Sequence, residues 1–154
     1  MRVYARESLI NYVNQDDIFK AVIHGMKFYK DLFGKPYAFS KYDQVFVPEL
    51  NFGGMENVAL ITFNERLLHR DEVITINKKM DQNMVVLHEL AHQWFGNLVT
   101  MKWWSDLWLN ESFATYMSYM ALSELKGPED FSTVAWLGFL ESKFGGIQDD
   151  SLET

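Results

Sequence analysis

Apolar residues between positions 16 and 33 recur every three or four residues, at Ile18, Val22, Met26, Tyr29 and Phe33. This spacing puts them on one face of an amphipathic helix. Asn14 or Asp16 can cap the start of that helix, and Gly34 followed by Pro36 can end it. The pattern therefore predicts a helix over residues 16–33.

β-Branched and aromatic residues indicate short strands around this helix. The end of one strand is expected at residues 3–5. Two further strands are expected at residues 44–47 and 58–63, on either side of a turn-rich segment at residues 52–57. In residues 72–77, Val73, Thr75 and Asn77 alternate with Ile74 and Ile76, so this range is predicted as another strand.

The second half of the chain is predicted to be helical. Residues 81–99 are apolar on nearly every side, which favours a buried central helix. Residues 106–126 and 129–144 are expected to form the next helices, ended by Gly127-Pro128 and Gly145-Gly146, and the last eight residues show no pattern. Because strands come first and helices follow, the predicted fold class is α+β.

Composition limits the kind of protein this can be. The 154 residues, 48% hydrophobic and 23% charged, suit one globular domain, and no repeat or linker divides residues 1–154. A net charge of −7 leaves no basic surface for phosphates, so nucleic acid is not expected as a partner. No apolar run reaches the roughly 20 residues of a membrane segment, and Arg6 and Glu7 interrupt the start where a signal peptide is apolar. We therefore expect a cytoplasmic protein.

The most specific motif is His88-Glu89-Leu90-Ala91-His92. Two histidines four residues apart on a helix share a face, so both imidazoles can reach one ion at about 2.0 to 2.1 Å, the distance that zinc requires. Glu89 lies beside them, free to act as a general base on a water. The chain has no cysteine, so only His, Asp and Glu could hold a metal. Either histidine alone is more often a satisfied core residue, but the pair around Glu89 favours a zinc site.

A catalytic zinc site needs a third protein ligand and one open position. Glu111 follows His92 after eighteen residues, in the run Trp108-Leu109-Asn110-Glu111-Ser112-Phe113. A second helix packed against the first can bring this carboxylate to the histidines. Alone, Glu111 would be interpreted as an exposed helix carboxylate, but burial among Trp108, Leu109 and Phe113 would be costly without a cation. Glu111 is therefore the candidate third ligand.

These motifs together resemble those of a known family. HELAH and WLNESFA, with eighteen residues between His92 and Glu111, are similar to the zinc signature of gluzincin metallopeptidases. GGMEN at residues 53–57 narrows the resemblance to the aminopeptidase N family. Residues 33–37, 41–43 and 47–49 also resemble the segment that leads into that motif. The resemblance runs from about Val3 to the end of the chain. It implies a thermolysin-like catalytic domain, with N-terminal strands followed by a helical half that carries the zinc site.

The resemblance implies a metalloaminopeptidase that hydrolyses the N-terminal peptide bond of peptides through a zinc-activated water. One Zn²⁺ would be bound by His88, His92 and Glu111, with Glu89 as the general base. The exopeptidase site would be formed by Gly53, Gly54, Met55, Glu56 and Asn57, with Glu56 holding the free α-amine of the substrate. Physical chemistry is compatible with this role, because adjacent glycines permit close approach and unusual backbone angles, and an edge segment can pair with a substrate backbone. Without the resemblance, this segment would be interpreted as a plain turn.

The chain also departs from the family. The family's oxyanion-stabilising tyrosine lies well beyond the third ligand, and neither Tyr116 nor Tyr119 matches it. The N- and C-terminal domains of the full enzymes are missing, so we expect a truncated catalytic domain, incomplete at its C-terminus. Two alternatives remain, a zinc- or peptide-binding module with weak or no activity and a thermolysin-like endopeptidase. The second is disfavoured by residues 53–57 and by Thr115, which stands where endopeptidases carry Asp.

Several other residues receive structural interpretations. The aromatic cluster of Trp103, Trp104 and Trp108 is predicted to belong to the core, with a substrate platform as the less favoured alternative. The methionines at 80, 84, 117 and 120 are predicted to be packing residues. His24 and His69 have no partner at ligand spacing and are interpreted as ordinary structural or surface residues. Asp106 is either a partner of a ligand histidine or the N-cap of the helix over residues 106–126.

Overall fold

The computed structural model describes residues 1–150, which form a small sheet and several helices. The strands are β1 (Val3–Tyr4), β2 (Asp43–Val47), β3 (Gly54–Met55) and β4 (Leu60–Asn64). The helices are α1 (Gln15–Phe33), α2 (Ile76–Ala91), α3 (Glu111–Ser123) and α4 (Ser132–Asp150). Short 3₁₀ segments lie at η1 (Glu7–Tyr12), η2 (Glu65–Leu67) and η3 (Trp104–Leu109). Residues 151–154, part of the patternless end of the sequence, lie outside the described residues.

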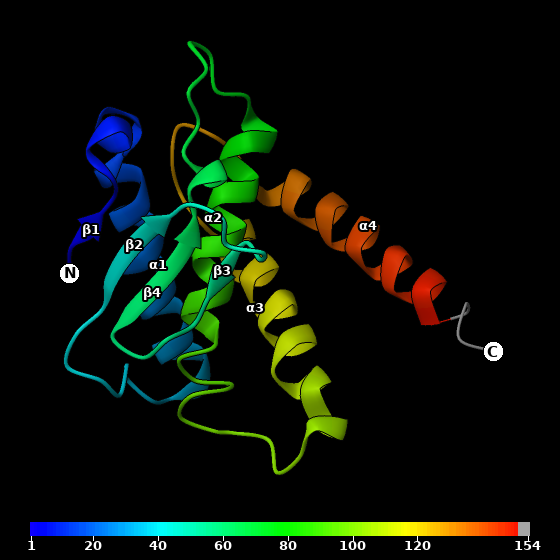
Figure 1. Ribbon diagram of the computed structural model, residues 1–154. Coiled ribbons are helices and arrows are strands. Elements are labelled where there is room, and N and C mark those ends of the chain that lie inside the picture. Colours follow the sequence, from blue (N-terminus) through cyan, green and yellow to red (C-terminus); the bar gives the residue numbers. More distant parts are fainter. Residues whose placement is uncertain (151–154) are drawn as a thin grey trace.

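The sheet has the strand order β1-β2-β4-β3 (Figure 1). β1 pairs with β2 and β2 with β4 in parallel, whereas β3 is antiparallel to β4 at the edge. Parallel strands need a crossover connection, and α1 supplies it between β1 and β2. The mixed α and β architecture, a small sheet with several helices, is confirmed, with α1 placed before most of the strands.

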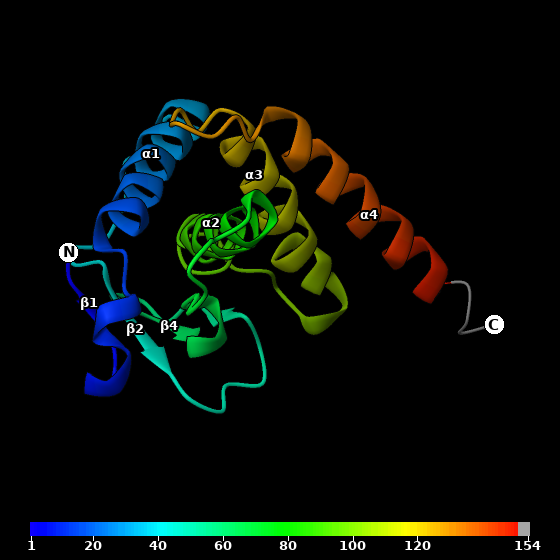
Figure 2. The same ribbon diagram turned by 90° about the horizontal axis from the view of Figure 1, so that it is seen from above.

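α1, α2 and α3 lie side by side, with α2 against the sheet, and α4 packs against α3 farther from the strands. Viewed from above, α2 is seen nearly end-on between α1 and α3, with the sheet below (Figure 2). Fully buried residues of α2 include Val86, Leu87 and Leu90, and the hydroxyl of Tyr29 on α1 donates to the carbonyl of Leu87 at 3.0 Å. α2 is thus the central element that positions the site, as the sequence predicts.

The first predicted helix and the main strands are confirmed. The side chain of Asn14 accepts a hydrogen bond from the backbone of Asp17 and caps α1. α1 ends at Phe33 because Gly34 adopts the left-handed conformation, with φ +65°. β2 and β4 lie within two residues of the predicted ranges 44–47 and 58–63 at each end.

The strand predicted at residues 72–77 is wrong. These residues have no strand partner in the sheet, Val73 is 78% exposed, and α2 begins within the range at Ile76. The hydroxyl of Thr75 caps the helix by accepting from the backbone N–H of Lys78. β-Branched residues form a strand only where a neighbouring strand is available, and here a helix cap uses the threonine instead.

The predicted helix ends also need correction. α2 ends at Ala91 rather than residue 99, and the chain turns back through Gly96, which has a φ of +129°. α3 begins at Glu111 with Asn110 at its N-cap, so Asp106 lies in η3 and is not the cap. α4 continues through Gly145 and Gly146, because neither has the positive φ that ends a helix at glycine.

The tryptophan cluster is not part of the core. Trp103, Trp104 and Trp108 are 70%, 69% and 58% exposed, because they lie on and beside η3, in the connection between α2 and α3. His24 and His69 have the structural role predicted for them, since each ring hydrogen-bonds a backbone carbonyl, of Ala121 and Lys78 respectively. Within residues 1–150, no helix has the length and apolar character needed to span a membrane.

Candidate active site

The two histidines of the HELAH motif lie on the last turn of α2. His88 is in the helix and His92 is its C-cap residue, so the helix ends at the second histidine. Their Nε2 atoms are 2.9 Å apart, and His92 is almost fully buried. The four-residue spacing therefore puts both rings on one face, as expected for a helix.

Glu111 is the first residue of α3 and faces this pair. Its Oε2 atom lies 3.4 Å from Nε2 of His88 and 3.6 Å from Nε2 of His92. Its side chain is 49% exposed, so the expectation that Trp108, Leu109 and Phe113 bury it is wrong. The two histidines, not an apolar environment, give this carboxylate its partners.

The donor atoms of these three residues suit a tetrahedral metal ion. Ligands about 2.0 to 2.1 Å from zinc are separated from one another by about 3.3 Å, close to the distances found here. Nδ1 of His92 lies 2.8 Å from Oδ1 of Asn110 and 3.1 Å from the carbonyl of Phe95. Because both partners are acceptors, Nδ1 carries a hydrogen, and Nε2 is the ring atom that can offer a lone pair to a metal ion once its own proton is displaced. A cation or a shared proton must neutralise these electron-rich atoms, so the donor set fits a zinc ion.

The charges of the site respond to one another. Hydrogen bonds with His88 and His92 hold the pKa of Glu111 well below its ordinary value. Burial lowers the pKa of His92, but the hydrogen bond with Glu111 and the nearby carboxylates of Glu56 and Glu89 outweigh burial and raise this pKa to about 9. His92 therefore carries a second proton at neutral pH, which a metal ion would displace.

Glu89 lies on α2 beneath the edge of the sheet. It is 4% exposed, and its Oε2 atom has no hydrogen-bond partner among the described residues. Burial, opposed by His92 and reinforced by Glu56 and Glu111, raises the pKa of Glu89 to about 8. A buried carboxyl group with an unused oxygen and a pKa near neutrality has the properties of a general base.

The segment Gly53–Asn57 runs past these residues along the edge of the sheet. Among residues 1–150, β3 pairs with β4 on one side only, so its other side is a free strand edge in the described sheet. Glu56 follows β3, and one of its oxygens lies within 4.8 Å of ligand atoms of Glu89 and His92. The carbonyl of Glu56 accepts hydrogen bonds from the side chains of Gln93 and Asn97 at 3.2 and 2.8 Å. The end of α2 thus holds this segment beside the histidines.

The two glycines of this segment have different surroundings. A Cβ atom added to Gly54 would lie 2.5 to 2.6 Å from three side-chain atoms of Glu89, whereas one added to Gly53 would be 3.5 Å from Val85. Neither glycine has a positive φ, so the expected unusual backbone angles are absent and close approach is the reason for Gly54. Asn57 does not line the cavity; its side chain donates to the hydroxyl of Thr62 at 3.3 Å.

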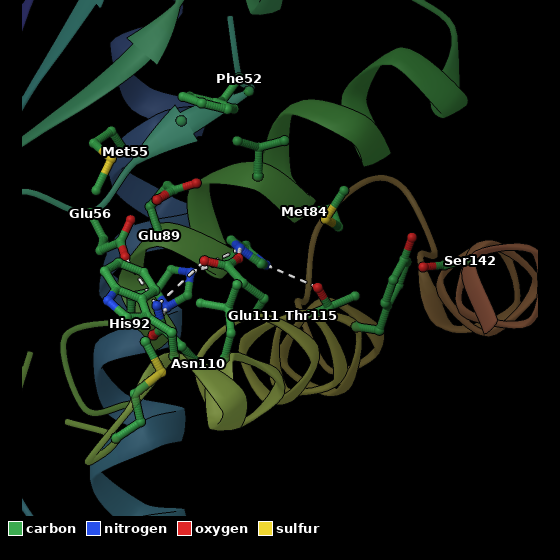
Figure 3. Close-up of a pocket in the computed structure, with 18 residues that line it drawn as sticks. Phe52, Met55, Glu56, Met84, Glu89, His92, Asn110, Glu111, Thr115 and Ser142 are labelled. Atoms are coloured by element: carbon green, nitrogen blue, oxygen red, sulfur yellow. Dashed lines mark hydrogen bonds and ion pairs between the residues drawn. The ribbon is translucent and has the colours of Figure 1, made fainter. Parts of the chain in front are cut away.

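All the other candidate residues open into one cavity of about 620 Å³. Figure 3 shows Glu56 and Glu89 on one side of it, with His92 and Glu111 close by. The wall is completed mainly by apolar side chains, namely Phe52, Met55, Met84, Val85, Met101, Trp104 and Leu107. Met84, predicted as core packing, lines this cavity. An extended chain with an apolar side chain can be accommodated here next to the charged cluster.

Two residues beside the ligands have contacts that the sequence did not assign. The hydroxyl of Thr115, one turn after Glu111, lies 3.3 Å from Nδ1 of His88. Asn110 contacts His92, whereas none of the hydrogen bonds found within residues 1–150 joins the side chain of Asp106 to a ligand histidine. The helix boundary at residue 111 decides this, because it places Asn110 rather than Asp106 at the start of α3.

Comparison with known proteins identifies relatives over most of the chain. Residues 18–154 match the model of the peptidase family M1 domain. "Probable aminopeptidase 2" of Sulfurisphaera tokodaii is 50% identical over 139 residues, covering 90% of this chain and 17% of that protein. Aminopeptidase N of Streptomyces lividans is 42% identical over 136 residues, which cover 86% of this chain and 16% of that protein. Leucyl aminopeptidase of Saccharolobus solfataricus is 51% identical over 102 residues, which cover 66% of this chain and 13% of that protein. The chain therefore spans less than a fifth of the length of these relatives.

Proposed function

The chain belongs to peptidase family M1, and from this membership we propose that it carries the zinc site of an aminopeptidase, which removes the first residue of peptides with a free N-terminus. The observation that carries the proposal is the convergence of His88, His92 and Glu111, with Glu89 and Glu56 beside them in one cavity. The names of the three relatives reported above, each an aminopeptidase, support the same activity.

We propose that His88, His92 and Glu111 hold one Zn²⁺. When bound, zinc supplies Lewis acidity, which polarises the scissile carbonyl and lowers the pKa of a water. The remaining chemistry belongs to the side chains. Glu89 accepts a proton from the attacking water and later gives it to the leaving amine, so it acts first as a general base and then as a general acid.

Glu56 is proposed to select the N-terminus. Its carboxylate binds the protonated α-amine of the substrate, while the free edge of β3 pairs with the substrate backbone. Because Glu56 lies close to Glu89 and His92, only the first peptide bond can reach the reacting groups. An N-blocked peptide lacks the ammonium group, so the site disfavours endopeptidase activity.

We also infer that residues 1–154 belong to one domain, a part of a thermolysin-like catalytic domain. Its support is the single cluster of buried residues that α1, α2 and α3 share with the sheet. The match to the family model runs through this whole region from residue 18 onward. No observation favours a binding module without activity.

The test combines metal content with turnover. Elemental analysis of the purified chain should find one zinc per chain, and the His88→Ala variant should contain far less. The zinc-loaded chain should release the fluorophore from L-leucyl aminomethylcoumarin but not from its N-acetylated form. A chelator should abolish release, and added zinc should restore it. Stoichiometric zinc without any release would favour the binding module, and cleavage of the N-acetylated substrate would favour an endopeptidase.

A further inference from the structure

Asn110 occupies a helix N-cap position without using its side chain as a cap. Asparagine is among the best N-cap residues, because its side-chain oxygen can accept from the backbone N–H groups of the first turn. At the start of α3, however, the side chain of Asn110 makes no capping hydrogen bond. It points into the cavity instead (Figure 3). The side chain of Asn110 therefore has partners other than the backbone of α3.

Those partners are three residues of the proposed site. The Oδ1 atom of Asn110 lies 2.8 Å from Nδ1 of His92. Its Nδ2 atom donates to Oε1 of Glu56 and to Oε1 of Glu111, each at 3.4 Å. One rigid amide thus contacts a histidine from the end of α2, a carboxylate that follows β3 and a carboxylate on α3.

The backbone around Asn110 is built to admit this side chain. Gly96 has a φ of +129°, and a Cβ atom there would collide with Oδ1 of Asn110. The turn after α2 therefore leaves room for the amide directly beneath His92. The same turn holds Asn97, whose side chain donates to the carbonyl of Glu56.

We propose that Asn110 is a positioning residue that couples amine recognition by Glu56 to the metal ligand His92. This inference rests on the proposed function, since it takes Glu56 as the amine site and His92 as a ligand. By accepting from Nδ1–H, Asn110 keeps the lone pair of Nε2 directed at the metal position. By donating to Glu56 and Glu111, it holds two carboxylates at a set separation in spite of their mutual repulsion.

The physical consequence is a fixed distance between the substrate amine and the metal. Free rotation of Glu56 would let an ammonium group bind at several distances from the scissile bond. The amide of Asn110 restricts that rotation through the carboxylate, and the side chains of Gln93 and Asn97 restrict the backbone of the same residue. Asn110 is the member of this group that also contacts a ligand histidine.

The experiment measures two equilibria in each variant of the 154-residue chain. The first is the affinity for Zn²⁺, measured by competition with a chelator. The second is amine discrimination, defined as the ratio of the dissociation constants of N-acetyl-L-leucine and L-leucine, measured by NMR titration at saturating zinc. Both probes carry the same carboxylate, so their ratio isolates the contribution of the free amine.

Asn110→Ala should lower both quantities, zinc affinity by about 10- to 100-fold and amine discrimination by about tenfold. Two matched controls separate the effects. Thr115→Val removes a contact of His88 and should lower zinc affinity alone, and Asn97→Ala removes a contact of Glu56 and should lower amine discrimination alone. Asn110→Asp keeps the acceptor for His92 but replaces the donor to Glu56, so it should retain zinc affinity within about threefold and still lose discrimination.

The coupling itself is tested in the Glu56→Ala background. If Asn110 acts through Glu56, then Asn110→Ala should change amine discrimination no further there. The inference would be overturned if Asn110→Ala lowered amine discrimination equally with and without Glu56. It would also be overturned if Asn110→Ala lowered zinc affinity alone, or changed neither zinc affinity nor amine discrimination. Circular dichroism checks folding, and Asn110→Asp, which preserves the shape of the side chain, serves as the second variant. If the unaltered chain itself binds no zinc, the proposed function fails and not the role of Asn110.

Discussion

Gly54 offers a sharp test of the geometry between the edge strand and the proposed general base. In Gly54→Ala, the new methyl group would lie 2.5 to 2.6 Å from three side-chain atoms of Glu89. Ordinary contacts begin near 3.5 Å, so one of the two groups must move by about 1 Å. Gly54 is fixed by its pairing with Phe63 on β4, and Glu89 is buried. We therefore expect Glu89 to be displaced.

The expected size of the effect follows from these contacts. Overpacking of this kind costs about 1 to 3 kcal/mol of stability. A misplacement of about 1 Å in a reacting group costs about 10²-fold in rate, within the range that a general base contributes. Zinc content should stay near the unaltered value, because neither Gly54 nor Glu89 is a proposed ligand. The matched control is Gly53→Ala, whose methyl group would meet Val85 at an ordinary 3.5 Å.

The assay compares both variants with the unaltered chain. Urea unfolding gives the change in stability, kcat/KM for L-leucyl aminomethylcoumarin gives the change in rate, and elemental analysis gives the zinc content. Gly53→Ala should stay within about 0.5 kcal/mol of the unaltered chain in stability. Equal stability and equal kcat/KM in Gly54→Ala and Gly53→Ala would refute the reasoning, since the two glycines would then be equivalent.

Three further outcomes are expected. Glu89→Gln should bind zinc as before yet lose at least about 10²-fold in kcat, because the amide cannot accept the proton; retained turnover would contradict the role of Glu89. Glu56→Ala should weaken the binding of free-amine substrates far more than that of N-acetylated peptides in inhibition assays, and an equal loss for both would count against an amine site. Zinc affinity should rise about tenfold per pH unit up to a pH of about 9, because zinc displaces the second proton of His92. A chelator competition that is flat between pH 6.5 and 8 would show that this proton is not displaced.

Local structure with local causes could be predicted from the sequence. The helix over residues 16–33 has both its apolar periodicity and its end signals, Asn14 and Gly34, within the segment itself. The pairing of His88 with His92 is also local, since four residues on a helix always return to the same face. The residue types of a zinc site and the absence of cysteine are likewise properties of the chain alone.

Only the tertiary structure decided which surfaces meet. Residues 72–77 have the composition of a strand but no neighbouring strand, so Thr75 caps α2 instead. The tryptophans in and beside η3 suit a core, yet they lie in the connection between α2 and α3 and remain largely exposed. In each case the preference of the residues for a strand or a core position is weak, and the contacts available in the folded chain decide their structure.

The site shows the same division. The sequence by itself was enough to propose His88, Glu89, His92 and Glu111 as the candidate residues of a metal site. The tertiary structure decided that Glu111 reaches the histidines while half exposed, and that Gly54 is needed for close approach to Glu89. These facts depend on how α3 and β3 pack against α2, and distances between separate elements are not encoded in the spacing of residues along the chain.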